Sequence, residues 1–181
     1  MKIKRGRDRI VVVFPLLRIV VKLPVIHSIV VLQRLLHYIK LGGWLTAIKF
    51  LTWPIEIRGS FGSLMLRGLI TNWGEFWLYY KTKNPFLQPT YFSFLGIFNI
   101  QQYGKPCDNA LDPWPQFFRL TNGQIREDNH HFEDFSNFCL NQGKIKMLDY
   151  GNKKSWGVII AYGEKITKSF SFADLKKESS N

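Results

Sequence analysis

Cysteine is scarce in this sequence. The 181 residues include only Cys107 and Cys139, and no Cys-x-x-Cys pair is present. A disulfide framework or a cysteine-rich structural zinc site therefore has no support, and a reducing compartment is the expected environment.

Long hydrophobic runs are also missing. The apolar run from Ile10 to Leu17 is followed at once by Arg18, and Lys22 and His27 interrupt the sequence soon after. A membrane-spanning helix needs about 18 to 20 consecutive apolar residues. A secretory signal fits poorly as well, because no small-residue cleavage site follows the short apolar core. We expect a soluble, cytoplasmic protein, with peripheral contact to a membrane left open.

Acidic residues are few, above all in the first half of the chain. The whole sequence carries 25 Lys and Arg against 13 Asp and Glu, and residues 1–83 hold 14 of the former against 3 of the latter, a net charge of +11. Such a charge suits nucleotide phosphates, nucleic acid or an acidic lipid surface, and composition alone does not choose among them. A basic face that only aids solubility is the alternative.

The residues that are abundant favour one folded unit of mixed class. Hydrophobic residues make up 46% of the chain and aromatic residues 15%, which is enough for a substantial core. Alternating β-branched runs predict strands over 9–17 and 18–24, separated by Pro15, and a broken strand pair over 91–104. The sequence therefore predicts an α+β protein.

Helical periodicity appears between these strands. Apolar residues at helical spacing follow Ser28, which we expect to cap an amphipathic helix that stops at Gly42-Gly43. A second short helix is expected over 44–53, a glycine-rich loop over 56–70, and a third helix over 73–81 with Asn72 as its cap. The basic and apolar residues of the first two helices suit either a membrane surface or, more commonly, a helix packed on the core.

The stretch from Asn137 to Gly151 has the pattern of a β-hairpin. Its turn falls at Asn141-Gln142-Gly143, and an alternating strand follows. This hairpin would bring Asn137 and Asp149 to the same end of two paired strands. An amide oxygen and a carboxylate held together suit Mg²⁺, whereas a surface hairpin with an acid in its turn is the plainer interpretation.

Several of these segments resemble the protein kinase-like superfamily, including its atypical small-molecule and lipopolysaccharide kinases. The resemblance rests on the order of five short segments: Val20-Val21-Lys22, Glu75, Asn84-Pro85-Phe86, Asn137, and Asp149-Tyr150-Gly151. It implies a two-lobed protein kinase-like fold. The basic lobe would cover residues 1–104, the connector 105–112, a truncated second lobe 113–175, and a tail 176–181.

The resemblance also implies site roles. Lys22, positioned by Glu75, would neutralise the phosphates of ATP, and Asn137 and Asp149 would hold Mg²⁺ for in-line phosphoryl transfer. Without the resemblance, Lys22 is a lysine at a sheet edge and Glu75 is an acid favourable to the dipole of its helix.

The acceptor-activating base is the weakest point of the comparison. The position five residues before Asn137, where kinases carry an aspartate, is Phe132. Asp134 and Asp128, in the polar cluster 127–134, are the acids that would replace it. The histidine pair of this cluster is a poor metal site, because adjacent side chains on a strand point apart. A solvated acidic loop without chemistry is the other interpretation of the cluster.

Other departures point to a minimal or degenerate member. The glycine-rich segment 59–63 follows Lys22 instead of preceding it, and only 30 residues follow Gly151. The alternative function is a non-catalytic basic binding module. It would act as a pseudokinase scaffold, or dock on nucleic acid or an acidic membrane surface through residues 1–83. The acceptor substrate is unknown at this stage.

Overall fold

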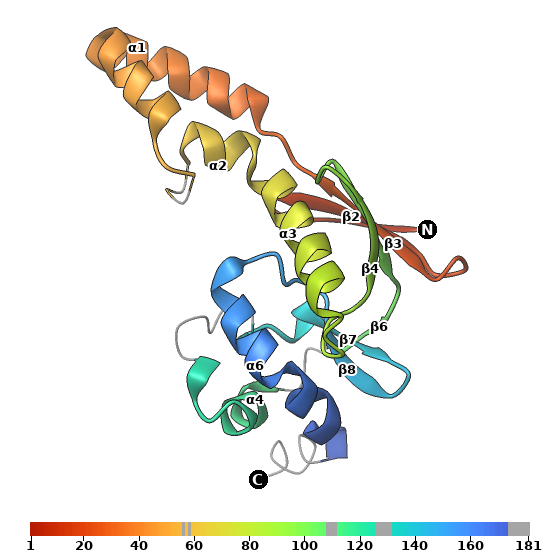
Figure 1. The fold of residues 1–181 in the computed structure, drawn as a ribbon. Helices are drawn as coiled ribbons and strands as arrows, with labels where there is room; N and C mark the ends of the chain where they lie inside the picture. Colours follow the sequence, from red (N-terminus) through yellow and green to blue (C-terminus); the bar gives the residue numbers. More distant parts are fainter. Residues whose placement is uncertain (56, 58, 108–111, 126–131, 174–181) are drawn as a thin grey trace.

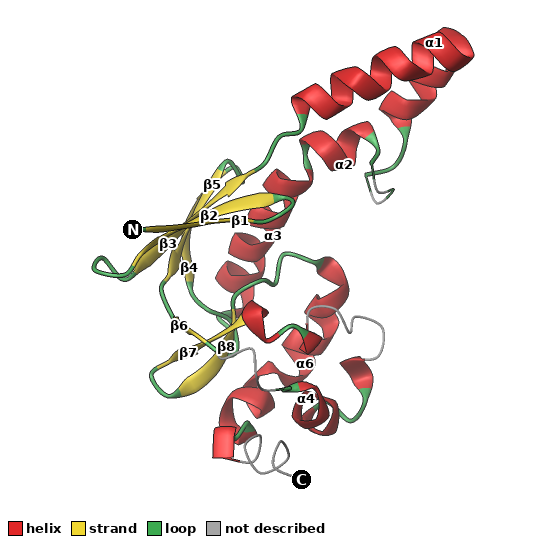
Figure 2. Cartoon of the chain, turned by 180° about the vertical axis from the view of Figure 1, so that it is seen from behind, coloured by secondary structure: helices red, strands yellow, loops and turns green. Residues whose placement is uncertain are grey.

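The computed structural model describes residues 1–55, 57, 59–107, 112–125 and 132–173. Over these residues the fold is α+β, with a five-stranded antiparallel sheet, a small three-stranded sheet and five α-helices (Figures 1 and 2). The α+β class predicted from the sequence is confirmed at this level. Within the described ranges, no helix is both long enough and apolar enough to cross a membrane.

The five-stranded sheet has the order β1-β2-β3-β5-β4, and all its neighbouring strands are antiparallel. Its strands are β1 (Lys2–Arg5), β2 (Arg9–Phe14), β3 (Ile19–Pro24), β4 (Thr90–Phe94) and β5 (Phe98–Gln102). Strands are present in each of the predicted ranges 9–17, 18–24 and 91–104, but the first ends at Phe14, because residues 15–18 form the turn, and a second turn lies at Gly96. β1 was not predicted: three of its four residues are Lys or Arg, so the segment has no β-branched run, and all four are exposed.

Helix α3 (Arg67–Thr82) lies across one face of this sheet and contacts β3, β4 and β5 (Figure 1). The predicted start of this helix at Asn72 is wrong, since Asn72 is fully buried in the helix interior. The loop predicted over 56–70 is also wrong in part: α2 (Phe61–Met65) lies within it, and α3 begins at its end. The Ser60 side chain caps α2 by accepting from the Ser63 amide.

Helix α1 (Ser28–Thr52) and α2 form an arm that extends away from the sheet, at the opposite end of the molecule from α4 and α6 (Figures 1 and 2). Gly43 has φ 68° and divides α1 into two legs, 28–42 and 44–52, as the glycine pair predicted. Ser28 does not cap α1: the cap position is His27, which makes no side-chain cap hydrogen bond.

The remaining elements form a helical half with its own small sheet. They are β6 (Lys105–Pro106), α4 (Trp114–Leu120), the 3₁₀ turn η2 (Phe135–Asn137), β7 (Phe138–Asn141), β8 (Lys144–Met147) and α6 (Lys153–Ser169). The main hydrophobic cluster joins this half to the segment between α3 and β4: Phe117, Phe138 and Ile159 belong to it together with Phe86, and each is fully buried. The connector predicted at 105–112 is described in part only, so the predicted lobe boundary stays a prediction.

Candidate functional site

The face of the five-stranded sheet that meets α3 is polar. Cross-strand pairing aligns two inward rows, Val11–Lys22–Asn99–Ser93 and Val13–Val20–Gln101–Thr90. The polar members of both rows are almost completely buried. Buried polar side chains are costly unless they are paired, so a polar layer between a sheet and a helix points to a functional or specificity role.

Lys22 and Glu75 form a buried ion pair in this layer. Lys22 Nζ donates to Glu75 Oε2 at 2.8 Å, and the two side chains are 5% and 0% exposed. Lys22 projects inward because it alternates with Val21 on β3, and Glu75 faces the sheet from the middle of α3. The pairing expected between these residues is present in the structure.

Arg9, at the start of β2, extends the pair into a network of four charges. Its Nη1 donates to Glu75 Oε1 at 2.6 Å, and its Nη2 lies 2.7 Å from Asp149 Oδ2. The charges therefore alternate in the order Lys22, Glu75, Arg9, Asp149, two positive and two negative. The Asp149 side chain, 32% exposed, is the most accessible of the four.

The electrostatic environment differs between the two cations. Burial lowers the pKa of Lys22 below its ordinary value, and the nearby Arg9 charge acts in the same direction against the opposing carboxylates. Burial would also lower the pKa of Arg9, but the Asp149 and Glu75 carboxylates outweigh it and raise that pKa. Lys22 is thus the cation whose charge responds most readily to a change in its surroundings.

The predicted hairpin carries Asp149 to this network. β7 and β8 pair antiparallel with Phe138 opposite Met147, and the turn residues Gln142 and Gly143 both have positive φ, as a tight hairpin requires. The Leu148 amide donates to the Asn137 carbonyl at 2.7 Å. Asn137 and Asp149 therefore lie at the same end of the hairpin, as predicted.

The backbone beside Asp149 is bound directly to Lys22. Lys22 Nζ donates to the Leu148 carbonyl at 2.7 Å. The same carbonyl accepts from Gln101 Nε2 at 3.2 Å. This contact joins the five-stranded sheet to the hairpin of the helical half and fixes Asp149 near the ion pair.

Tyr150 and Gly151 anchor the segment that follows. The Tyr150 hydroxyl donates to the Gln88 carbonyl at 2.6 Å and lies 2.7 Å from Thr90 Oγ1, with the ring fully buried. Gly151 packs so closely on α3 that a Cβ there would collide with Thr71. The φ of Gly151 is not positive, so the structure requires glycine here for close approach to α3 and not for backbone freedom.

The candidate bases are not brought into the network by any contact that the structure describes. Asp134 is exposed, and its carboxylate accepts from the Ser136 amide at the start of η2. Asp128 lies outside the described residues, as do the two histidines of its cluster. Phe132, at the usual base position, is fully buried in the core. The structure thus gives no support to a base at this position.

Asp149 and Asn137 are the described residues best suited to a metal ion in this site. Within the described ranges, no group of three or more His, Cys, Asp and Glu side chains is placed to hold a metal ion. An Mg²⁺ ion bound through nucleotide phosphates needs only one or two protein oxygens, for which Asp149 and Asn137 have the right chemistry. Arg9 already holds Asp149 Oδ2, so a metal at that oxygen would have to displace the guanidinium.

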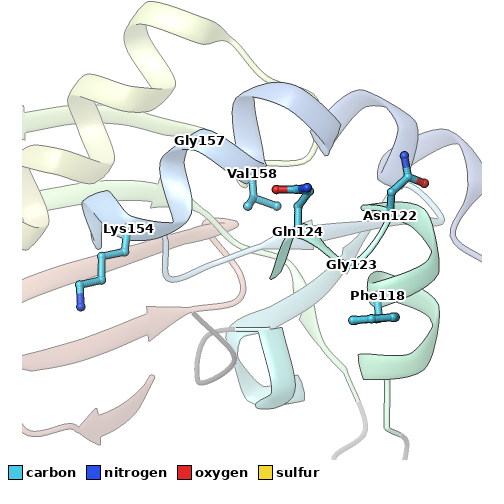
Figure 3. Close-up of a pocket in the computed structure, with 7 residues that line it drawn as sticks. All are labelled: Phe118, Asn122, Gly123, Gln124, Lys154, Gly157 and Val158. Carbon is cyan, nitrogen blue, oxygen red and sulfur yellow. The ribbon is translucent and has the colours of Figure 1, made fainter. Parts of the chain in front are cut away.

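A hollow on the surface of the helical half has none of the four network residues in its lining. It is lined by Phe118, Asn122, Gly123, Gln124, Lys154, Gly157 and Val158, from α4, the turn after it and α6 (Figure 3). Among the described residues, Lys154 is the one charged side chain in its lining. Because the described part of this lining has no carboxylate, histidine or thiol, we place the candidate site at the Arg9–Lys22–Glu75–Asp149 network.

No protein-family model, curated protein sequence or solved structure matches this chain.

Sequence reasoning missed Arg9, Asn72, Asn99 and Gln101 as members of the site. Asn72, Asn99 and Gln101 each keep a buried amide oxygen without a hydrogen-bond partner among the described residues. The strand pattern held a signal, since β5 alternates Asn99 and Gln101 with apolar residues. We would have assigned its apolar face to the interior. Arg9 gave no signal beyond being a cation in front of a β-branched run.

Proposed function

We propose that this protein is a divergent kinase-like phosphotransferase that binds ATP and Mg²⁺ at the Arg9–Lys22–Glu75–Asp149 network. The observation that carries the proposal is the buried Lys22–Glu75 pair. Contacts of Lys22 with the Leu148 carbonyl and of Arg9 with Asp149 hold this pair near Asp149, although the residues are far apart in the sequence. A lysine fixed by a glutamate and a nearby aspartate are the elements that kinase-like sites use to hold nucleotide phosphates and metal.

The donor inventory of Lys22 supports phosphate binding. An ammonium group has three donors, and Glu75 and the Leu148 carbonyl accept two of them. A phosphate oxygen would be the third acceptor. Binding a dianionic group would also stabilise the charged form of Lys22, whose pKa is lowered by burial in the structure described.

The metal would be held by Asp149, with Asn137 from the paired strand end. Release of Asp149 by Arg9 would make its Oδ2 available to the ion and leave Arg9 to pair with Glu75 and the phosphates. This exchange is a step that ordinary kinase-like sites do not need.

A second candidate is a non-catalytic relative, a pseudokinase scaffold that keeps the architecture without turnover. It is favoured by the Arg9–Asp149 pair, by the burial of Phe132 at the usual base position, and by the use of Asp134 as a cap. In this version, nucleotide binding would be weak or metal-independent. The two candidates differ in chemistry, so one set of assays distinguishes them.

Nucleotide-induced thermal stabilisation tests the first candidate. The parent protein is melted with ATP alone, Mg²⁺ alone and both together, beside Lys22→Met, Asp149→Ala and Asp134→Asn. Lys105→Met is the matched control, because Lys105 lies on β6 and is exposed. A ligand that binds the folded state at 100 times its Kd adds about 2.7 kcal/mol of stability.

We expect a shift that needs both ATP and Mg²⁺, is lost in Lys22→Met and Asp149→Ala, and persists in Lys105→Met and Asp134→Asn. Each shift is measured against the same variant without ligand, which removes the effect of the substitution on folding. An Asp149→Ala protein that binds Mg-ATP as tightly as the parent would contradict the site assignment. ADP release that Asp134→Asn abolishes would support turnover, whereas an ATP shift that does not need Mg²⁺, without ADP release, would support the pseudokinase.

A further inference from the structure

The arm formed by α1 and α2 exposes an unusual amount of apolar surface. On the first leg of α1, Ile29, Leu32 and Leu36 are 72%, 57% and 58% exposed. Their spacing of three and four residues places them on one helix face. The sequence suited either a membrane surface or, more commonly, a helix packed on the core, and in the structure this face is exposed.

The turn between the two legs of α1 carries three further exposed apolar side chains. Leu41, Trp44 and Leu45 flank Gly43 and are 71%, 71% and 76% exposed. This turn lies at the outer end of the arm (Figure 1). Isolated exposed apolar residues need no explanation, but a continuous set at the end of a projection marks a contact site.

The arm has an ordered interior, so its exposed side chains are not those of a collapsed or partly folded segment. Phe50 is fully buried between the legs, with ring centroids 5.2 Å from Tyr38 and 6.3 Å from Trp53. Arg34 Nη1 donates to the Gly59 carbonyl at 2.8 Å and closes the base of the arm. The apolar tip is therefore presented by a packed helical hairpin.

The charge of the arm selects its partner. Between Ser28 and Ile55 the sequence contains Arg34, Lys40 and Lys49 but no Asp or Glu. A second copy of the chain docked symmetrically on this face would bring like charges together. Nucleic acid would satisfy the cations but leave the leucines and tryptophan without apolar contacts. An anionic bilayer surface satisfies both, because its headgroups attract Lys and Arg while its acyl boundary accepts the apolar tip.

We propose that the α1 arm is a membrane-docking element whose tip, Leu41, Trp44 and Leu45, inserts into the interfacial region of an anionic lipid surface. Lys40 and Lys49 flank the tip in sequence and would contact the headgroups. A tryptophan at the tip suits the boundary between headgroups and acyl chains. This inference does not depend on nucleotide binding at the Arg9–Lys22–Glu75–Asp149 network.

Co-sedimentation with vesicles tests the proposal on the whole chain. Vesicles of phosphatidylcholine with about 30 mol% phosphatidylserine are compared with phosphatidylcholine alone, at low and high salt. The test variant is Leu41→Asn with Leu45→Asn. The matched control is Leu16→Asn with Leu17→Asn, which removes two leucines that are 100% and 66% exposed in the β2–β3 turn.

We expect the parent to bind the anionic vesicles and the Leu41/Leu45 variant to bind about tenfold less or weaker still. The Leu16/Leu17 control should bind like the parent, and Lys40→Gln with Lys49→Gln should remove most of the salt dependence. Brominated lipids should quench the parent's tryptophan fluorescence more than that of Trp44→Phe. Unchanged melting temperatures would show that the variants are folded.

Three results would overturn the proposal. The first is a parent that stays in the supernatant with anionic vesicles. The second is equal vesicle binding by the parent and the Leu41/Leu45 variant. The third is a lipid-independent dimer, measured by analytical ultracentrifugation, that the Leu41/Leu45 variant abolishes, since this would assign the apolar tip to a second copy of the chain.

Discussion

Lys22 Nζ lies 2.8 Å from Glu75 Oε2, although 53 positions separate the two residues in the sequence. The whole α1–α2 arm is inserted between them. Burial of two ions costs desolvation free energy, and the ion pair offsets it only if the charged atoms have hydrogen-bond partners. Arg9 donates to the other oxygen, Oε1, so the buried Glu75 carboxylate has a cationic partner at both oxygens.

Removal of the charge of Glu75 should destabilise the fold strongly. Glu75→Gln keeps the shape of the side chain but leaves Lys22 buried without its counter-ion, and breaking a buried pair on one side costs about 3–5 kcal/mol. Denaturant unfolding measures the loss. Glu164→Gln is the control, because Glu164 pairs with Lys168 at the surface with both side chains 69% exposed, and it should change little. A similar small effect at Glu75 would contradict the network.

The hydroxyl of Tyr150 should contribute to stability through its two buried contacts. Tyr150→Phe removes the donor to the Gln88 carbonyl and the contact with Thr90, at an expected cost of about 1–3 kcal/mol. Tyr91→Phe is the matched control, since Tyr91 is 56% exposed. Equal unfolding free energies for the two variants would show that the hydroxyl contacts do not stabilise the protein.

Two turn glycines separate backbone strain from steric collision. Gly96 and Gly143 have φ of 77° and 74°. Alanine in the left-handed region costs about 1–2 kcal/mol at either position. A Cβ at Gly96 would also collide with the Leu69 carbonyl of α3, whereas a Cβ at Gly143 meets nothing within 4 Å. Gly96→Ala should therefore lower the unfolding free energy clearly more than Gly143→Ala, and the reverse order would contradict the packing of α3 on this turn.

The stability should fall at alkaline pH because of the buried thiols. Burial raises the pKa of Cys107 to about 11 and that of Cys139 to about 12, from 9.0. The contribution of the protonated thiols to the free energy of unfolding is fully present below their pKa of 9.0 in the unfolded state, and it is lost as the pH rises through their pKa values in the folded state. The lowered pKa of Lys22 acts with the opposite sign, since the unfolded state then holds its proton more tightly up to pH 10.5.

Cys139→Ala isolates one thiol from these opposing effects. Between pH 8 and 10.5 the parent should lose about 2 kcal/mol more stability than Cys139→Ala, for a thiol whose pKa rises from 9.0 to about 12. Unfolding free energies across this range measure the difference, and the absolute cost of the substitution cancels. Identical pH slopes would mean that Cys139 is accessible to hydroxide in the folded state.

Local pattern alone determined much of this protein's architecture. The β-branched runs of β2 and β3, the Gly43 break in α1 and the turn at Gln142-Gly143 each follow from the conformations that those residues favour, and each is present in the structure. The pairing of Lys22 with Glu75 was reached from the order of short segments that resemble kinase-like proteins. Nucleotide binding and phosphoryl transfer stay predictions.

Tertiary structure alone decided which side of each amphipathic element is buried. On β5 the polar residues Asn99 and Gln101 turn inward, and on α1 the apolar residues Leu32 and Leu36 turn outward. Alternation fixes that two faces differ, but burial depends on what packs against them, and α3 brings Glu75 and Asn72 to the sheet instead of an apolar face. The same packing brings Arg9 to Asp149. The sequence could not predict this contact, because no local rule relates the start of β2 to a residue more than a hundred positions later that follows a hairpin.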